Sequence, residues 1–343
     1  GLFTGFVRRA LRRELEIDNP LFRNEALVSE RDRRRLVRAQ QWKNDNDLPE
    51  DGALLPMLGD LAYEMQLSGG SPAGSQVRID CDEAAAILAH EHAADILLAG
   101  AALGILDEDA DRDEVLFGHQ LFQEYFAARH LARRPNPDLV RAPWRGQAQV
   151  PDLCDLIEAL APADPLPPLP STGWEETAML ATSIARDCGA FVRGLLGANL
   201  ALAGRCAAQP GVRQRLDETL CDELRRALVE RSRCPSADLR DRVACGLALG
   251  NLGDPRLVRG EGPDGGYLVP ELVEVPGGEY PLGQDEPYVL FGRHSDLCRP
   301  RHIVRVEAFQ IARFAVTNAE WACFMAAGGY DDERWWCGPD ARA

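Results

Sequence analysis

The chain has 343 residues, of which 45% are hydrophobic and 27% are charged, and its formal net charge is −16 at pH 7. This length predicts two or three domains, and the apolar content is sufficient for real cores, which excludes a disordered protein. The negative charge argues against a general nucleic-acid-binding surface, so we do not expect nucleic acid as a partner.

Residues 1–52 are expected to form a helical segment. Their apolar side chains recur at helical spacing, at Leu2, Phe3, Phe6, Val7 and Leu11. The helix is already under way at Gly1, where no initiator methionine stands, so we expect the chain to be part of a longer protein. Basic residues concentrate between Arg31 and Arg38. We interpret them as a solvated helix face or a seam to an upstream domain, with DNA or RNA binding as the alternative.

Residues 53–134 are expected to fold as a winged helix, because helices are followed by a terminal hairpin. The apolar pattern predicts helices over 54–65, 82–89 and 93–103, a short strand over 77–79, and a hairpin built from 104–106 and 115–117. A Gly/Ser/Pro cluster at 68–75 is expected to end the first helix.

Two patterns in this region superficially offer metal ligands. The acidic hairpin tip, residues 107–114, fails the EF-hand test because Arg112 replaces the required glycine and Gly118 the bidentate glutamate, so we interpret it as a solvated turn. In His90-Glu91-His92 the zinc spacing is absent because position 94 is alanine, and residues two apart on a helix diverge by about 200°. No metal site is predicted.

Residues 116–128 carry the most specific pattern in the chain, Leu-Phe-Gly-His-Gln-Leu-Phe-Gln-Glu-Tyr-Phe-Ala-Ala. It predicts the end of a strand running into an amphipathic helix, with Gln123 and Glu124 on the polar side. The apolar face is expected to contain Leu121, Phe122, Tyr125, Phe126 and Leu131. His119 is expected in the first helical turn, near the partly positive amino end.

This run closely resembles the signature at the end of the winged helix in NACHT-type STAND NTPases, the class that includes the animal NOD-like receptors. In that family the histidine contacts the phosphate of bound ADP and helps to hold the closed, inactive state. The resemblance implies that His119 binds this cofactor if the NTPase core is present; the alternative is that His119 only caps or packs. It also implies ADP or ATP with Mg²⁺ as cofactors, an upstream NTPase core in the same protein as partner, and self-assembly on activation.

The NTPase machinery itself is missing from these residues. Lys43 is the only lysine, and its surroundings, Gln41-Trp42-Lys43-Asn44-Asp45, lack the Gly-Lys-Ser/Thr of a phosphate-binding loop. No catalytic residue is therefore assigned.

Residues 135–258 are expected to form a HEAT-like helical repeat region. The proline-rich segment 161–170 cannot sustain a helix or a central strand, and helical patterns follow it over 174–184, 191–196, 212–229 and 239–252. Antiparallel helix pairs of this kind stack into a solenoid. Such an array either reads a ligand or partner or serves as a rigid spacer.

Residues 241–256 resemble the terminal unit of HEAT-like repeats. The apolar residues expected to face a preceding helix are Val243, Leu247, Leu249 and Leu252. Gly253 is expected to end the helix by adopting the left-handed backbone conformation, and Pro255 prevents continuation of the helix.

Residues 259–343 change from a helical to an extended pattern after the glycine-rich stretch 260–266. Alternating residues predict a sheet over 304–311, with a slip of one residue that suggests a bulge or twist. Thr317 or Asn318 can cap a following helix in which Trp321, Phe324 and Met325 share a face.

Three blocks, 273–283, 300–309 and 315–330, followed by Trp335-Trp336, are similar to the start of the formylglycine-generating-enzyme, or sulfatase-modifying-factor, domain. The resemblance implies part of an α+β, C-type-lectin-like fold. The paired cysteines of the active enzyme lie beyond the part covered, and Cys298, Cys323 and Cys337 match no catalytic position, so we interpret them as ordinary thiols. Attachment to a STAND switch favours a recognition module that binds a protein or small-ligand trigger.

The ten cysteines include no Cys-x-x-Cys pair, and most fall within apolar helical patterns, which indicates core thiols in a reducing compartment. No apolar run approaches the roughly 18 residues that span a bilayer, and no signal-peptide pattern opens the chain. We therefore expect a cytoplasmic protein without a membrane partner.

The expected fold class is mainly α: a winged helix and a HEAT-like array, followed by part of a C-type-lectin-like (FGE-sulfatase) domain. The favoured function is the regulatory and sensor portion of a bacterial STAND signalling NTPase, nucleotide-gated and ligand-triggered, with antiphage defence as a setting. Two alternatives stay open: a formylglycine-generating-type oxidative enzyme domain on a helical scaffold, and a helical protein-interaction scaffold.

Overall fold

The computed structural model describes residues 1–39, 42–69, 77–109, 112–151, 153–158, 160–161, 164–286, 288–290, 293–295 and 298–336. Cys337, the centre of the acidic turn, most of the Gly/Ser/Pro cluster at 68–75 and part of the proline-rich segment lie outside these ranges. The chain divides into a first unit of residues 1–156 and 166–252 and a second unit of residues 157–165 and 253–343. The described part of the first unit is mainly helical, and the described part of the second consists mainly of paired strands.

The first unit begins with α1 (Leu2–Glu16), whose apolar stripe buries Val7, Ala10 and Leu11. A 3₁₀ turn (Pro20–Arg23), α2 (Glu30–Arg34) and a π-helical turn (Arg35–Ala39) follow. Three arginines of the basic stretch pair with acidic residues outside it: Arg31 contacts Asp51 at 3.2 Å, Arg34 contacts Glu30, and Arg35 contacts Asp47. These ion pairs fit the interpretation of a solvated helix face.

A three-stranded antiparallel sheet and four helices make up the next part of the first unit. The elements are α3 (Leu54–Ser68), β1 (Arg78–Asp80), α4 (Cys81–Leu88), α5 (Ala93–Ala102), β2 (Leu106–Asp109), β3 (Glu114–Phe117) and α6 (Gln120–Arg133). The strand order is β1-β3-β2, and the central Val115, opposite both Ile79 and Glu108, is fully buried. The hydrophobic side of this sheet therefore belongs to the core of the unit.

Two local expectations in this part are wrong. Residues 104–105 do not begin a strand: Gly104 has a φ of +69°, and the amides of Gly104 and Ile105 close the end of α5 on Ala101 and Gly100. His90 and His92 lie in the turn between α4 and α5 rather than on a helix, so their rings approach to 5.7 Å between centroids instead of diverging.

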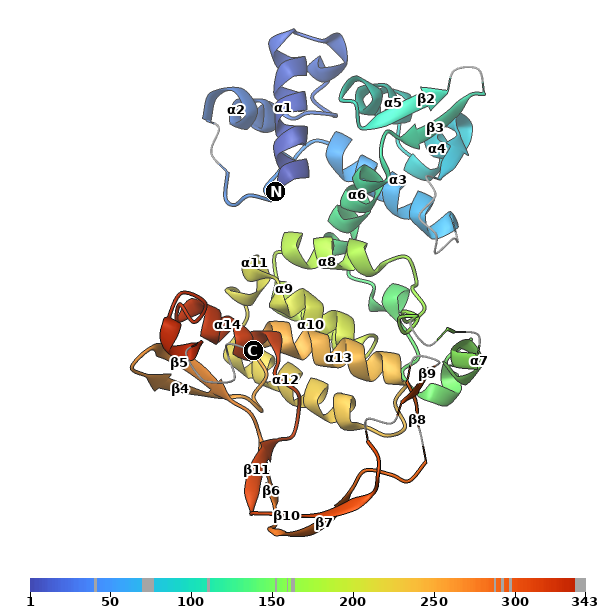
Figure 1. Ribbon diagram of the computed structural model, residues 1–343. Helices are drawn as coiled ribbons and strands as arrows, with labels where there is room; N and C mark the ends of the chain where they lie inside the picture. The colour runs from blue at the N-terminus through green and yellow to red at the C-terminus, as the bar shows by residue number, and fades with distance from the viewer. Residues whose placement is uncertain are drawn as a thin grey trace. The chain divides into compact units, whose positions relative to one another are not determined.

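Helix α6 packs against α3 on one side and against α8 (Glu175–Ile184) on another, as Figure 1 shows. Its middle is buried on nearly every side, over the run from Tyr125 to Leu131. Tyr63 of α3 lies 5.3 Å from Trp174, the residue before α8, and Gln66 of α3 donates to Thr177 of α8 at 3.0 Å. The sheet-containing part and the following helices therefore share one core.

The remaining elements of the first unit are the short turns Pro137–Val140 and Gly146–Ala148, α7 (Leu153–Glu158, which reaches into the second unit), α9 (Cys188–Leu196), α10 (Leu200–Ala208), α11 (Pro210–Arg213), α12 (Glu218–Arg233) and α13 (Leu239–Leu252). The predicted helix over 212–229 is two helices, because Asp217 accepts a hydrogen bond from the Leu220 amide and starts α12 afresh. Gly253 ends α13 with a φ of +97°, as predicted.

Helix α10 has no counterpart among the sequence predictions. Asn199 caps it by accepting from the Leu202 amide, and most of its residues are buried. A Cβ on Gly204 would lie 2.9 Å from both Ala248 of α13 and Leu228 of α12, so glycine is needed for this close approach. Arg205 is its one exposed residue, so its polar side is narrow and the helical period is easily overlooked in the sequence.

In the second unit the strands form separate pairs, β4 (Val258–Gly262) with β5 (Gly265–Val269), β6 (Leu272–Val275) with β11 (Phe309–Ala312), β7 (Gly278–Leu282) with β10 (His302–Val306), and β8 (Tyr288–Leu290) with β9 (Arg293–Ser295). The ribbon of β6 and β11 continues into that of β7 and β10 (Figure 1). The strands are interrupted at the junction: residues 276–277 separate β6 from β7, and residues 307–308 separate β10 from β11. The predicted slip in apolar phase is therefore a break between two strand pairs and not a bulge.

Helix α14 (Asn318–Ala326) follows the strands and is capped by Thr317 as predicted. The Thr317 hydroxyl accepts from the Glu320 amide at 3.2 Å, and the Glu320 carboxylate accepts from the Thr317 amide at 2.8 Å, which completes a capping box. A 3₁₀ turn, Glu333–Trp335, ends the described part of this unit.

The phenol of Tyr125 is a structural hydrogen-bonding centre and supplies a first prediction. Its oxygen lies 2.8 Å from the fully buried Thr4 hydroxyl and accepts from Arg129 at 3.1 Å. Tyr125→Phe should lower the free energy of unfolding by about 1–3 kcal/mol, because Thr4 and Arg129 each lose a partner where water cannot replace it. Urea denaturation followed by tryptophan fluorescence measures the change.

Tyr63→Phe is the matched control, because the Tyr63 hydroxyl accepts only a long bond of 3.4 Å from Asn136 in partly buried surroundings. Its effect should be clearly smaller. Equal effects of the two substitutions would contradict the role assigned to Tyr125.

Candidate functional site

His119 is the N-cap residue of α6, one position before the first helical turn in which it was expected. Strand β3 ends at Phe117, and the Gly118 amide donates to the Ile105 carbonyl at 2.9 Å, so the chain turns sharply into the helix. The His119 backbone is extended, with φ −153° and ψ 140°, and its Nδ1 accepts from the Leu121 amide at 3.1 Å. The residue is exposed.

This cap determines which ring nitrogen of His119 can act on another molecule. Because Nδ1 accepts a hydrogen bond, the neutral ring carries its proton on Nε2. An Nε2–H group at the amino end of a helix can donate to an anionic oxygen, and the helix dipole also attracts negative charge at this end. Capping and anion contact are therefore compatible roles for His119, each using a different nitrogen.

The apolar face of α6 differs from the predicted one. Leu121 is 45% exposed, whereas Gln123, placed on the polar side by the pattern, is only 4% exposed. Phe122 packs against the rings of Phe3 at 5.6 Å and Phe6 at 5.0 Å on α1. Because α6 contacts α1, α3 and α8, its buried surface is wider than a single amphipathic stripe.

Two buried polar side chains near the end of α6, Arg129 and His130, connect it to its neighbours. Arg129 donates to Glu50 at 2.7 Å and to the Asn46 carbonyl at 3.0 Å; burial alone would lower the pKa of its guanidinium, but Tyr125 and Glu50 raise it. His130 lies 2.6 Å from the Asp60 carboxylate and stacks on Tyr63 at 4.2 Å. Burial opposes ionisation of Asp60, yet His130 and Arg133 hold its pKa below the usual value.

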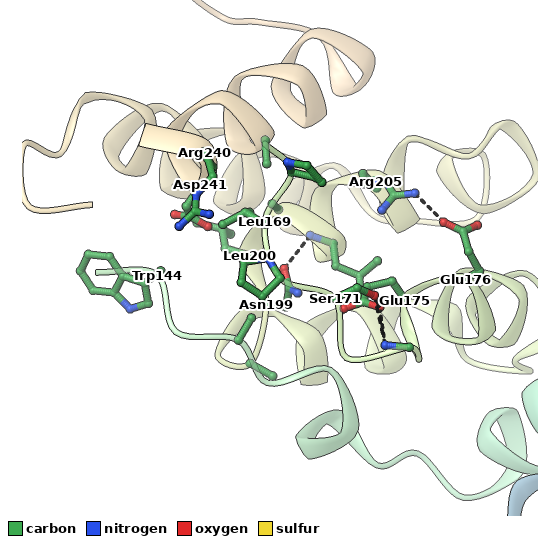
Figure 2. Close-up of a pocket in the computed structure, with 18 of the residues that line it drawn as sticks. Trp144, Leu169, Ser171, Glu175, Glu176, Asn199, Leu200, Arg205, Arg240 and Asp241 are labelled. Carbon is green, nitrogen blue, oxygen red and sulfur yellow. Dashed lines mark hydrogen bonds and ion pairs between the residues drawn. The ribbon is translucent and has the colours of Figure 1, made fainter. Parts of the chain in front are cut away.

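A cavity of about 710 Å³ lies beside α6 in the first unit. Its walls come from α6, α8, α10 and α13, from residues 142–149 and from the proline-rich segment 166–171. Figure 2 shows Trp144 with Arg240 and Asp241 toward one side, the Arg205–Glu176 pair toward the other, and Leu169 and Leu200 between them. The Arg205–Glu176 ion pair measures 2.9 Å.

Glu124 brings a carboxylate of α6 to this cavity. It accepts from Gln120 at 2.8 Å and is about half-buried. Burial is the main cause that raises its pKa, the charge of Glu176 adds to the increase, and Gln120 and His119 act against it. The site therefore joins His119 and an ionisable cavity residue on adjacent turns of one helix.

The described part of the second unit presents aromatic side chains to solvent. Trp321 lies 5.0 Å from Phe324, Tyr330 stacks on Trp336 at 6.0 Å, and the Trp321 indole donates to the Tyr330 hydroxyl at 3.0 Å. Apart from Gly329, the residues whose burial is described in this unit are exposed or half-buried. Among the described residues, the cluster is therefore partly exposed to solvent rather than enclosed in a core.

The thiols and other metal-binding side chains assemble no centre in the described residues. Cys298 is exposed and Cys323 is half-buried, whereas Cys188, Cys206, Cys221 and Cys245 are buried in the helical part; burial raises the pKa of Cys245 to about 12. No group of three His, Cys, Asp or Glu within the described ranges could hold a metal ion. Over the same ranges, no helix is both long and apolar enough to cross a bilayer.

Comparison with known proteins assigns the C-terminal part. Residues 262–342 match the family described as the sulfatase-modifying factor enzyme 1-like domain, FGE-sulfatase, which confirms the resemblance of this part. The hercynine oxygenase of Mycolicibacterium smegmatis is 49% identical over 67 residues, which are 19% of this chain and 14% of that protein. The hercynine oxygenase of Mycolicibacterium thermoresistibile is 54% identical over 52 residues, 15% of this chain and 10% of that protein.

The hercynine oxygenase of Mycobacterium tuberculosis is 50% identical over 52 residues, 15% of this chain and 11% of that protein. The chain thus spans about a tenth to a seventh of the length of these curated relatives. No solved structure matches the chain significantly.

The raised pKa of Glu124 predicts a specific dependence of stability on pH. An acid whose folded pKa is raised contributes stability below its unfolded pKa, about 4.3 for glutamate, and this contribution is lost as the pH rises through the folded value. Glu124→Gln should therefore be more stable than the wild type at pH 7, and the difference should vanish below about pH 4. Thermal denaturation between pH 3.5 and 7.5 tests this.

Glu223→Gln is the control, because Glu223 lies on the exposed face of α12. It should leave the pH profile unchanged. If Glu124→Gln destabilises the chain at pH 7, then interactions of the ionised Glu124 outweigh the cost of its partial burial, and the predicted pH dependence is wrong.

Proposed function

We propose that the chain is the regulatory and sensor portion of a bacterial STAND signalling NTPase. In this proposal residues 53–134 are its winged helix, the helices from α8 to α13 form a HEAT-like array, and the FGE-sulfatase-like part is a recognition module. The supporting observation is local: residues 116–128, whose sequence resembles the NACHT-type signature, fold as a strand end, a sharp turn and a helix, with His119 exposed at the amino end.

The nucleotide would be held through His119. An Nε2–H donor at a helix amino terminus matches a phosphate oxygen of ADP in both charge and hydrogen-bonding sense. The NTPase core that binds the rest of the nucleotide, with Mg²⁺, would be an upstream partner in the same cytoplasmic protein. Contact of His119 with ADP would then tether α6 to that core.

The geometry of α6 explains how such a tether could hold an inactive state. The helix is packed on both α3 and α8, so a force on its amino end acts on the sheet-containing part and on the helical array together. A trigger shifts the balance only through its difference in affinity for the closed and open states. We propose that exchange of ADP for ATP then permits self-assembly, in a setting such as antiphage defence.

The trigger would bind the FGE-sulfatase-like part. Its aromatic cluster consists of the exposed Trp321, Tyr330, Trp335 and Trp336 around the half-buried Phe324, and it supplies rigid apolar contact area of the kind that dominates recognition surfaces. A protein or a small ligand could use this surface.

A second candidate is an oxidative enzyme domain carried on the helical scaffold. It is favoured by the identity of about one residue in two with hercynine oxygenases over the aligned C-terminal segment. Because that segment is under a fifth of the chain, the candidate ranks second. The remaining alternative, a plain helical interaction scaffold, makes no use of either resemblance.

His119→Ala tests the first proposal in the protein that joins this chain to its NTPase core. Loss of one charge-assisted hydrogen bond, worth about 1.5–3 kcal/mol, should speed ADP release by roughly tenfold to a hundredfold and raise basal signalling. Release of a fluorescent ADP analogue in stopped flow measures the rate.

His92→Ala controls for the loss of an imidazole, because His92 lies in the turn before α5 and pairs only with nearby acidic residues. Its ADP release should match the wild type. An unchanged rate in His119→Ala would remove the nucleotide-sensing role, whatever its effect on stability.

The oxidative candidate predicts dioxygen uptake that depends on hercynine or a related betaine. An oxygen electrode measures this with the protein that carries the chain. Under the favoured proposal, uptake in the presence of hercynine stays at the buffer rate; substrate-dependent uptake would reverse the ranking of the two candidates.

A further inference from the structure

Helix α13 contributes an apolar wall to the cavity beside α6. Val243 and Leu247 were expected to face a preceding helix, yet they are 47% and 68% exposed, whereas Leu249 and Leu252 on the same helix are buried. Val243 and Leu247 instead line the cavity. The cavity therefore presents apolar surface that the described residues leave open to solvent.

Gln123 of α6 places an unpaired amide in the cavity wall. The residue is only 4% exposed, and among the described residues its side-chain amide has no hydrogen-bond partner. Neither amide atom is closed off from water, so the group faces the cavity that the residue lines. A nearly buried amide is normally paired with protein, water or a ligand. This side chain therefore marks a place for a polar group of a bound molecule.

The arginines of the cavity wall are already paired with carboxylates. Three arginines line the cavity, and each forms an ion pair: Arg205 with Glu176 at 2.9 Å, Arg231 with Asp241 at 3.2 Å, and Arg240 with Asp238 at 3.0 Å. Glu175, a further lining carboxylate, accepts from the Ser171 hydroxyl at 2.6 Å and from the Thr172 amide at 2.8 Å (Figure 2). Burial opposes its ionisation, but these hydrogen bonds hold its pKa below the usual value. An anionic ligand would have to compete with an existing ion pair for an arginine.

Glu124 is the least compensated carboxylate of the cavity. It is half-buried and forms no ion pair with a described residue; its Oε1 accepts from Gln120 at 2.8 Å, and its Oε2 has no donor among those residues. Burial raises its pKa, and the charge of Glu176 adds to the increase, against the opposite effects of Gln120 and His119. A positive charge beside Oε2 would stabilise the ionised form. The electrostatics of the cavity therefore favour a cation.

We propose that the cavity binds a small organic cation that carries an N–H donor, such as a primary ammonium group, on an apolar body. The cationic group donates to Oε2 of Glu124, and the Gln123 amide supplies a second polar contact. The apolar body lies against Val243 and Leu247. The volume of about 710 Å³ is that of a small-molecule pocket. The inference rests on the first unit alone and does not depend on the proposed function.

Two probes with the same apolar body and different charge test the site on the whole chain. Hexylammonium carries a primary ammonium group on an alkyl chain, and 1-hexanol replaces that group with an uncharged hydroxyl. Titration calorimetry or ligand-observed NMR at neutral pH should give millimolar affinities, as expected for fragments. Hexylammonium should bind roughly tenfold more tightly, because a charge-assisted hydrogen bond at a half-buried carboxylate contributes about 1.4 kcal/mol, which is a factor of ten.

Glu124→Gln should remove the preference for hexylammonium, and Glu223→Gln should keep it. Both substitutions change the net charge equally, so the nonspecific attraction of a cation to this acidic chain is the same in the two variants. Glu223 is exposed on α12 and does not line the cavity. Because Glu124→Gln is expected to stabilise the fold at pH 7, loss of the preference cannot be ascribed to unfolding.

Gln123→Met keeps the length of the side chain and removes its amide. It should weaken hexylammonium binding at least threefold, because one hydrogen bond is lost. Gln147→Met should leave the affinity unchanged. Gln147 is exposed in the 3₁₀ turn Gly146–Ala148 and does not line the cavity, so it is a matched control.

Butylammonium tests the apolar wall, because it carries the same charge on a body that is shorter by two methylene groups. It should bind roughly fivefold to tenfold more weakly than hexylammonium, since the missing groups would be buried against the wall. The proposal is overturned if hexylammonium and 1-hexanol bind the wild type equally, if Glu124→Gln keeps the preference, if Gln123→Met leaves hexylammonium binding as it was, or if butylammonium binds as tightly as hexylammonium.

Discussion

Helix α6 is enclosed over the turns from Tyr125 to Leu131, and this enclosure brings an arginine and a histidine into the interior together with the aromatic side chains. A buried charged or polar side chain is tolerated only when it has hydrogen-bond partners. Arg129 finds Glu50, Tyr125 and the Asn46 carbonyl, and His130 finds Asp60. The position of α6 is therefore specified by directional contacts with segments distant in sequence, and the surrounding helices adopt positions that satisfy them.

Helix α6 connects the exposed His119 with the cavity in the first unit. At its amino end the His119 ring is exposed, and one turn later Gln123 and Glu124 form part of the cavity wall. Occupation of the cavity would change the surroundings of α6 within one turn of His119. Any coupling between the two places would need two arrangements of α6 with different affinities for each ligand, since spatial proximity alone transmits no free energy.

The sequence pattern located helices correctly where one face of the helix is exposed to solvent. The spacing of Val7 and Leu11 placed α1, and that of Leu58 and Met65 placed α3. It missed α10, where Arg205 is the one exposed residue between Leu200 and Ala208 and the polar side of the helix is therefore narrow. The motif at 116–128 located His119 to within one residue of its observed N-cap position, because strand, turn and cap are encoded locally.

The cavity could not be found in this way, because tertiary contacts between distant segments form it. One lining residue, Gln149, lies in a segment without a periodic pattern. Two contacts hold this segment against the start of α13: the Asp238 amide donates to the Trp144 carbonyl at 2.9 Å, and Arg145 forms a β-bridge with Ala237.

The sequence pattern also could not distinguish a bulge from a break at 307–308, since both shift the apolar phase by one residue. A Cβ on Gly277 would meet the Ala308 amide nitrogen at 3.0 Å. This close approach of the two junction segments is a contact between residues distant in sequence, so the pattern does not show it.

The proline-rich wall of the cavity has a thermodynamic consequence. Pyrrolidine rings at positions 167, 168 and 170 restrict the backbone before any guest arrives, so little segmental freedom remains to be lost on association. A flexible loop in the same place would have to become ordered each time. Any molecule that packed against this wall would therefore meet a segment that loses little conformational freedom on association.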